Sequence, residues 1–141
     1  MLSFSGSAFS AQSKHSDWVV DRSGGCRIWN QVPEENEAVL WSGACRDGLA
    51  QGHGIVQWFD NDSPTERYEG ELRDGKPNGH GILTRRNGDR YEGDWRDGKA
   101  DGAGQVQLSS GYKYSGVWSA GCTRDDKNNI IAVGTNAGIC P

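Results

Sequence analysis

Apolar and charged positions alternate along much of the chain, and this alternation predicts short antiparallel strands. The clearest run is Tyr68, Glu69, Gly70, Glu71 and Leu72. A period of two is typical of a strand that buries one face and exposes the other. An Arg-Asp-Gly triplet follows the run, and glycine there favours a turn because it tolerates positive φ. The pattern therefore predicts β-hairpins with one apolar face and one acidic face.

The same motif returns every 23 residues. The copy at 68–75 (YEGELRDG) is followed by a copy at 91–98 (YEGDWRDG) and by a weaker copy that ends at Gly121. An earlier copy occupies 41–48 and stands 27 residues before the next one. We expect a loop around residues 60–64 to absorb the four extra residues. A fixed period of this length is the signature of a repeat architecture.

Glycines recur at fixed places in each unit. Pairs separated by one residue follow the first three copies: Gly52 and Gly54, Gly79 and Gly81, and Gly102 and Gly104. Glycine inside a strand weakens it unless something must approach closely, so we expect an aromatic ring of the neighbouring strand to lie over these positions. Asn87-Gly88 and Ser110-Gly111 predict the turns at the other end of the hairpins.

These motifs resemble the MORN (membrane occupation and recognition nexus) repeat. Its pattern is an aromatic residue, a glycine two positions later, an aromatic residue or leucine two positions after that, a further glycine, and then Gly-x-Gly. The resemblance covers residues 41–121. The sequence departs from the most usual residues at Cys45 and Leu72, where tryptophan is usual, and at Gln105, where an aliphatic residue normally follows Gly-x-Gly. It implies protein binding or dimerisation, and a lipid association that the acidic net charge disfavours. The fold class that we predict is all-β: an elongated, single antiparallel β-meander of tandem MORN hairpins with N- and C-terminal caps.

The segments outside the repeats are predicted to be a leader and two caps. Gly25 to Trp29 aligns with Gly54 to Trp58 and predicts a degenerate half-repeat at the N-terminal end. Repeat arrays need atypical ends that cover their open faces. The expected division is a flexible leader or signal-peptide remnant at 1–17, an N-terminal cap at 18–40, the array at 41–121 and a C-terminal cap at 122–141.

Four cysteines permit three disulfide pairings, and none has the spacing of a zinc or redox motif. We predict that Cys26 bonds Cys45 and that Cys122 bonds Cys140. The first pair would join the cap strand to the first repeat, and the second would close the C-terminal tail. The even number of cysteines favours an extracytoplasmic location, periplasmic or secreted, if the disulfides form. A cytoplasmic location is expected otherwise.

Composition and charge argue against several classes of function. The net charge of −4 argues against nucleic acid and makes binding to anionic membranes unlikely. His53 and His80 occupy equivalent repeat positions about 10 Å apart, which is too far for two ligands of one metal ion. Serine and cysteine nucleophiles lack an evident histidine partner. We therefore expect no enzyme activity, no metal and no cofactor.

The repeat aromatics are the candidate site residues. They are Trp41, Tyr68, Tyr91, Tyr114, Trp95 and Trp118. They form either only the core or, in addition, a groove for a protein or peptide partner, with the Tyr91 hydroxyl at its edge. On the other face, we expect the acidic row of Glu69, Glu71, Glu92 and Asp94 to be solvated.

The function that this predicts is a non-catalytic binding or scaffold module. A homodimer formed by edge pairing remains open. The alternatives are an extracellular carbohydrate-binding module and a small hydrolase with an unrecognised site.

Overall fold

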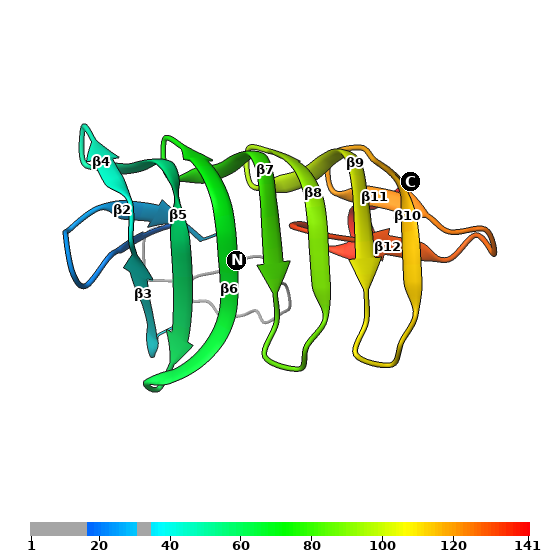
Figure 1. Ribbon diagram of the computed structural model, residues 1–141, viewed down its shortest axis with the longest axis horizontal. Coiled ribbons are helices and arrows are strands. Elements are labelled where there is room, and N and C mark those ends of the chain that lie inside the picture. The colour runs from blue at the N-terminus through cyan, green and yellow to red at the C-terminus, as the bar shows by residue number, and fades with distance from the viewer. Residues whose placement is uncertain (1–16, 31–34) are drawn as a thin grey trace.

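A computed structural model describes residues 17–30 and 35–141, and these form a long row of antiparallel strands with a cap at each end (Figure 1). The first strands are β1 (Trp18–Val20), β2 (Arg27–Trp29), β3 (Glu37–Trp41), β4 (Ala44–Arg46), β5 (Leu49–Asp60) and β6 (Ser63–Arg73). They are followed by β7 (Lys76–Thr84), β8 (Arg90–Arg96), β9 (Lys99–Gln107), β10 (Lys113–Trp118), β11 (Cys122–Arg124), β12 (Ile130–Ala132) and the 3₁₀ turn η2 (Ala137–Ile139). The expected leader, 1–17, lies outside the described residues except for Asp17.

Strands β5 to β10 form the meander, each hydrogen-bonded to its neighbours in chain order. The glycines and aromatics keep register across it, so that Gly81 lies opposite Gly93 and Leu83 lies opposite Tyr91. The predicted all-β antiparallel meander is therefore confirmed. It is not the whole fold, because β11 and β12 form a separate two-stranded sheet.

The Asp-Gly turns stack the repeats on one another. Asp74 and Gly75 have φ of 51° and 81°, which is the two-residue turn that suits a hairpin. The turn glycine then donates its N–H to the preceding repeat, from Gly75 to the Ala50 carbonyl at 2.9 Å and from Gly98 to the Pro77 carbonyl at 2.9 Å. The turn sequence therefore links successive hairpins as well as closing each one.

The four inserted residues lengthen a hairpin and do not form the loop that we expected. Strands β5 and β6 continue until Asp60 pairs with Ser63, and only Asn61 and Asp62 remain as the turn. Both turn residues have positive φ, 51° and 67°. Asn and Asp tolerate this conformation, so the segment closes as a tight hairpin.

The N-terminal cap crosses the array instead of extending it. Strand β2 pairs with β1 and meets β5 only in a parallel contact between Arg27 and Leu49. The predicted Cys26–Cys45 disulfide is confirmed, with its Cα atoms 5.6 Å apart. The aligned half-repeat is thus a strand, but it does not occupy the position of a meander strand.

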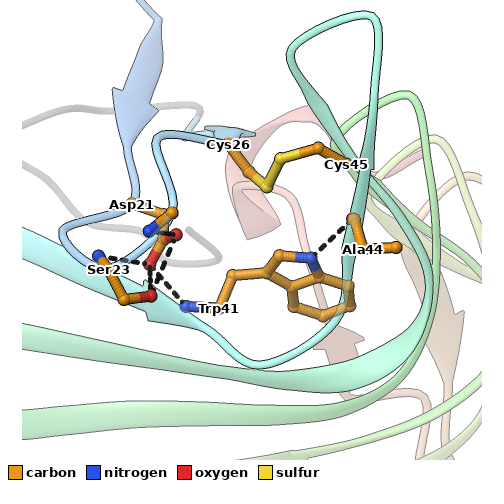
Figure 2. Close-up of a disulfide and its surroundings, with 7 residues drawn as sticks. Asp21, Ser23, Cys26, Trp41, Ala44 and Cys45 are labelled. Carbon is orange, nitrogen blue, oxygen red and sulfur yellow. Dashed lines mark hydrogen bonds between the residues drawn. A yellow bond between two sulfur atoms is a disulfide. The ribbon is translucent and has the colours of Figure 1, made fainter.

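A buried carboxylate joins this cap to the first repeat (Figure 2). Asp21 is 2% exposed and accepts the Trp41 N–H at 2.9 Å and the Gly24 N–H at 2.7 Å. Burial opposes ionisation of Asp21, but the hydrogen bonds from Trp41, Gly24 and Ser23 outweigh it and lower the pKa. The charged form of Asp21 therefore stabilises the cap.

The C-terminal cap inserts a residue into the stack of turns. Val133 donates to the Gly121 carbonyl at 2.8 Å and accepts from the Ala100 N–H at 3.2 Å. The predicted Cys122–Cys140 disulfide is also confirmed, with its Cα atoms 5.7 Å apart. In Figure 1 the two cap strands, β11 and β12, run across the meander strands behind β9 and β10. Within the described residues, no helix has the length and apolar character needed to cross a membrane.

Candidate functional site

The repeat aromatics form the core of the array, and of the six only Tyr91 also contributes to the lining of the half-open hollow described below. Five of the six are between 1% and 4% exposed: Trp41, Tyr68, Tyr91, Trp95 and Trp118. Only Tyr114, on the last strand of the meander, is half-buried. The expectation of a partly exposed Tyr91 at the edge of a groove is therefore wrong, since Tyr91 is 2% exposed.

Close ring packing explains this burial. Tyr91 meets Trp95 and Trp118 edge to face, with ring centroids 5.3 and 5.1 Å apart. The Tyr91 ring also lies over Gly104 of the next strand, where any Cβ would overlap it. The expectation that a ring lies over the paired glycines is confirmed for the second glycine of each pair and is wrong for the first. No ring lies over the first glycines, which instead adopt positive φ: Gly52, Gly79 and Gly102.

The tyrosine hydroxyls are satisfied inside the fold. Tyr68 donates to the Glu71 carbonyl at 2.8 Å and Tyr91 donates to the Asp94 carbonyl at 3.0 Å. Burial is the main cause that raises the pKa of both phenols, and the nearby carboxylates add to it. Neither hydroxyl is therefore available to a partner.

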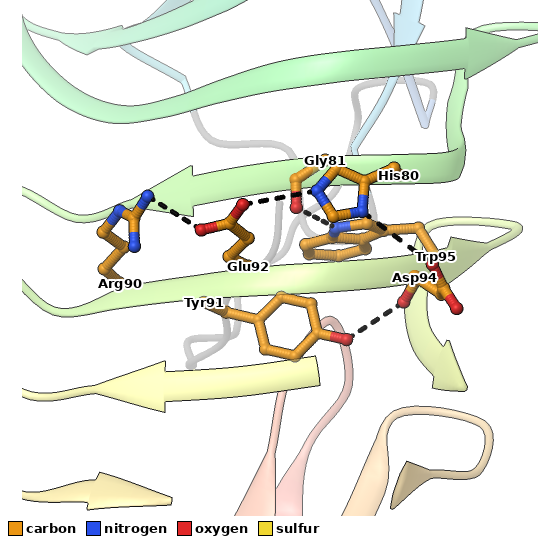
Figure 3. A network of polar contacts seen from close by, with 7 residues as sticks. All are labelled: His80, Gly81, Arg90, Tyr91, Glu92, Asp94 and Trp95. Carbon is orange, nitrogen blue, oxygen red and sulfur yellow. Dashed lines mark hydrogen bonds and ion pairs between the residues drawn. The ribbon is translucent and has the colours of Figure 1, made fainter. Parts of the chain in front are cut away.

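The other face of the meander carries exposed ion pairs between neighbouring strands (Figure 3). The His80 ring lies 3.4 Å from a Glu92 oxygen and 3.9 Å from an Asp94 oxygen, and Arg90 bonds Glu92 at 3.0 Å. His53 lies 3.1 Å from Glu71 in the preceding repeat. Each histidine thus pairs with the carboxylates of the following strand, and the acidic row lies on the solvated face as expected.

These pairs do not amount to a metal centre. The two carboxylates beside His80 approach different ring nitrogens, Nε2 for Glu92 and Nδ1 for Asp94. In the part of the chain that the structure describes, no group of three or more His, Cys, Asp or Glu side chains could hold an ion.

A half-open hollow of about 90 Å³ lies between the inner face of the meander and the C-terminal cap. Aliphatic side chains of the meander form one wall, and β12 with the residue after it forms the other. The lining residues used below are Leu83, Val106, Leu108 and, on the cap side, Ile131 and Val133. Leu108 is 37% exposed, so the apolar lining continues to the surface. The hollow can hold an aliphatic side chain that enters from solvent.

Charged groups of both signs stand at this hollow. Arg85, Asp89 and Arg90 are part of its lining. Asp89 accepts the Ser109 N–H at 2.9 Å, and this hydrogen bond is the largest cause that lowers the Asp89 pKa. Arg85 pairs with Glu66 at 3.5 Å. The apolar lining is therefore bordered by an ionised carboxylate and the Arg85 guanidinium, whereas the Arg90 guanidinium bonds Glu92 on the outer face.

Sequence reasoning missed this hollow for two reasons. The aliphatic residues that follow each Gly-x-Gly, Leu83 and Val106, were predicted only as strand residues. The run Ile130 to Val133 was assigned to the cap, and its position opposite Leu83 and Val106 depends on how the tail folds back. The signal in the sequence was this apolar run after the last repeat.

A comparison with known families agrees with the repeat geometry. The family model described as MORN repeat matches residues 43–63, 68–90 and 91–111. No curated protein matches the chain. The three matched segments begin at Gly43 and at the buried Tyr68 and Tyr91. Together they cover β5 to β9 and the turns between them, except for residues 64–67 of β6.

Proposed function

Because the chain is built on three MORN repeats, we propose that it is a non-catalytic protein-binding module whose site is the hollow beside the C-terminal cap. The observation that carries the proposal is the half-open apolar lining of Leu83, Val106, Leu108 and Ile131. Pockets that bind ligands are mostly apolar with a few placed polar groups, and this hollow has both features. The expected occupant is an aliphatic side chain of an extended peptide segment.

The charges at the hollow favour a peptide over a lipid surface. Arg85 and Asp89 both belong to the lining, so the site offers partners for both charge signs of a polypeptide. The net charge of −4 opposes association with anionic membranes. A peptide with an acidic residue beside its aliphatic anchor would place that residue near the Arg85 guanidinium.

The carbohydrate-binding alternative loses its main support. Sugar binding would need exposed aromatic faces, and the rings of Tyr68, Tyr91 and Trp95 are at most 3% exposed. Among residues 17–30 and 35–141, the exposed aromatic side chain is Tyr112, at 38%, and a single ring forms no row. We therefore propose a protein partner and no catalysis.

Two disulfides support an oxidising compartment for this function. Cys26–Cys45 and Cys122–Cys140 both close loops that hold the caps. Disulfides of this structural kind persist outside the cytoplasm. We propose an extracytoplasmic location, which free-thiol labelling of protein from the native source would test.

Selection from a peptide library displayed on phage tests the proposed site. The target is the full chain, and the counter-target is Leu108→Glu, which places a charge at the mouth of the hollow. Gln107→Glu is the matched control, because Gln107 is exposed on the opposite face of the same strand. We expect enriched peptides to bind the wild type and the Gln107→Glu variant equally and to bind the Leu108→Glu variant no longer. Peptides that bind all three proteins equally would contradict the proposal.

A further inference from the structure

The chain departs from the repeat pattern after the turn that follows β10, where the C-terminal cap begins. After β10 the chain makes the usual turn, since Ala120 and Gly121 have φ of 49° and 89° and the equivalent Asp97 and Gly98 have 49° and 85°. In the earlier repeats, the chain then runs back along the strand it has just left. Here Cys122–Arg124 pairs with β12 instead. Thr123 donates its hydroxyl to the Val117 carbonyl at 2.9 Å and Tyr114 donates to the Arg124 carbonyl at 3.0 Å, so the cap covers the Val117 end of β10. Among the described residues, the rest of the outer edge of β10 has no strand beside it.

The backbone of β10 presents hydrogen-bonding groups at this position. In an antiparallel strand, alternate residues direct their N–H and C=O to the same side. Leu108 donates to the Tyr112 carbonyl at 2.8 Å, so the even-numbered residues of β10 face β9. Lys113 and Ser115 consequently face outward, and within residues 17–30 and 35–141 nothing pairs with their backbone groups. The equivalent residues of β8, Arg90 and Glu92, pair with the next strand.

Between Lys113 and Gly116 this edge lacks the usual protection against strand addition, whereas Thr123 covers its Val117 end. Bulges, prolines and charges normally keep an exposed edge from pairing. The β9–β10 register has no bulge, and β10 contains no proline and a single charged residue, Lys113. Val117 is 70% exposed, where the equivalent residues of β6 and β8 are Glu71 and Asp94. The opposite edge is different, because it is divided into the short strands β3 and β4.

The repeats specify which strand would fit. Tyr68 lies opposite Leu83 and its ring covers Gly81, so that any Cβ at Gly81 would overlap the ring. Tyr91 has the same relation to Val106 and Gly104. A strand beside β10 would then need an aliphatic residue opposite Tyr114 and a glycine two positions before it.

We propose that the outer edge of β10 accepts an extended strand of a partner protein with the sequence pattern glycine, any residue, aliphatic, any residue, which continues the sheet by half a repeat. The incoming strand runs antiparallel to β10 and pairs with Lys113 and Ser115. Its glycine lies opposite Gly116, and its aliphatic residue covers the half-buried Tyr114. This surface is separate from the hollow, so the inference goes beyond the function proposed above.

A peptide copied from the chain itself tests this proposal. The peptide is Gly-Ala-Gly-Gln-Val-Gln-Leu-Ser, the sequence of residues 102–109, and it carries no charged side chain. Titration into the isotope-labelled full chain is followed by NMR. We expect saturable shifts of the Lys113 and Ser115 amides and slower hydrogen exchange at both. Absence of saturable shifts at these two amides overturns the proposal.

Modified peptides act as controls that leave the fold of the protein intact. N-methylation at the positions copied from Gln105 and Gln107 removes the donors that pair with β10, and it should weaken binding at least about tenfold. Replacing the glycine copied from Gly104 by valine should have a similar effect, because its side chain meets the Tyr114 ring. Equal binding of the modified and unmodified peptides contradicts strand addition. Leu108→Glu in the protein should leave peptide binding unchanged, which separates this edge from the hollow.

Discussion

The two faces of the meander are made by alternate residues of the same strands, yet they differ in almost every physical respect. On β8 the inner Trp95 is 3% exposed, and the outer Asp94 beside it has a side chain that is 56% exposed. The inner face is a continuous series of rings and glycines in contact. The outer face is a set of separate ion pairs between strands in water.

The comparison shows which face the repeat pattern constrains. Each inner ring needs a glycine beneath it, so the ring and its glycine recur as a pair in successive repeats. The outer pairs are independent, and they change from His53 with Glu71 to Ala103 with Val117 at the last hairpin. A repeat motif therefore identifies the core, and the surfaces that differ between repeats are where partners are expected.

Removing a large ring from the inner face should have the largest effect on stability. Trp95→Ala removes a ring that contacts both Tyr68 and Tyr91. We expect a loss of about 3–5 kcal/mol in the free energy of unfolding, the range for a large buried aromatic. Chemical denaturation measures it, with Asp94→Ala as the exposed control. A loss below about 1 kcal/mol for Trp95→Ala would contradict the assignment of this face as core.

Asp21 tests whether a buried charge can stabilise when backbone amides surround it. Asp21→Asn weakens charged hydrogen bonds to Trp41 and Gly24, and we expect a loss of about 1.5–3 kcal/mol at neutral pH. The pKa is lowered in the folded state, so this stabilisation is present above the ordinary value of 3.8 and is lost as the pH falls below it. Unfolding measured between pH 7 and pH 3 should show the gap between the two proteins closing. A gap that is constant with pH would indicate that ionisation of Asp21 is not its source.

Tyr91→Phe tests the difference between the two faces by removing a single hydroxyl group from the inner face. The hydroxyl donates to the Asp94 carbonyl inside the core, so its removal leaves that bond unmade. We expect a loss of about 0.5–1.5 kcal/mol, measured by thermal unfolding. An unchanged melting temperature would instead indicate a hydroxyl in water, as the groove interpretation required.

The outer pairs should contribute least. His80→Ala removes contacts to Glu92 and Asp94, and the His80 side chain is 61% exposed. Exposed ion pairs contribute roughly 0–1 kcal/mol, so we expect a change of at most about 0.5 kcal/mol. Repeating the denaturation at high and low salt checks this. A loss as large as that of Tyr91→Phe would remove the distinction between the faces.

Much of the fold could be predicted from local patterns. The 23-residue period, the Asp-Gly turns and the glycines under rings are each determined by neighbours within one hairpin, and all were predicted correctly. The two disulfides were also predicted, the first from the register of the cap strand beside the first repeat and the second as the closure of a loop in the tail. The exposure of Tyr91 was not, since it depends on how closely the rings of Trp95 on the same strand and of Trp118 on β10 pack against it.

The hollow depends on contacts between distant parts of the chain. Ile131 approaches Leu83 only because Val133 hydrogen-bonds to Gly121 and Ala100 and turns the tail under the sheet. A short apolar run gives no indication of this path by itself. The crossing of β2 over the turns was missed for the same reason. The alignment of residues 25–29 with residues 54–58 predicted a strand but gave no indication of the direction in which it runs.

Methyl NMR with a library-selected peptide tests most directly whether binding belongs to the hollow at the end of the inner face. The methyl groups of Leu83, Val106, Leu108 and Ile131 report on the hollow, and those of Ile55, Ile82 and Val117 report on the outer face. The account predicts that the peptide shifts the first set and leaves the second unchanged. Shifts confined to Ile55, Ile82 and Val117 would contradict it and would place the binding surface on the outer face.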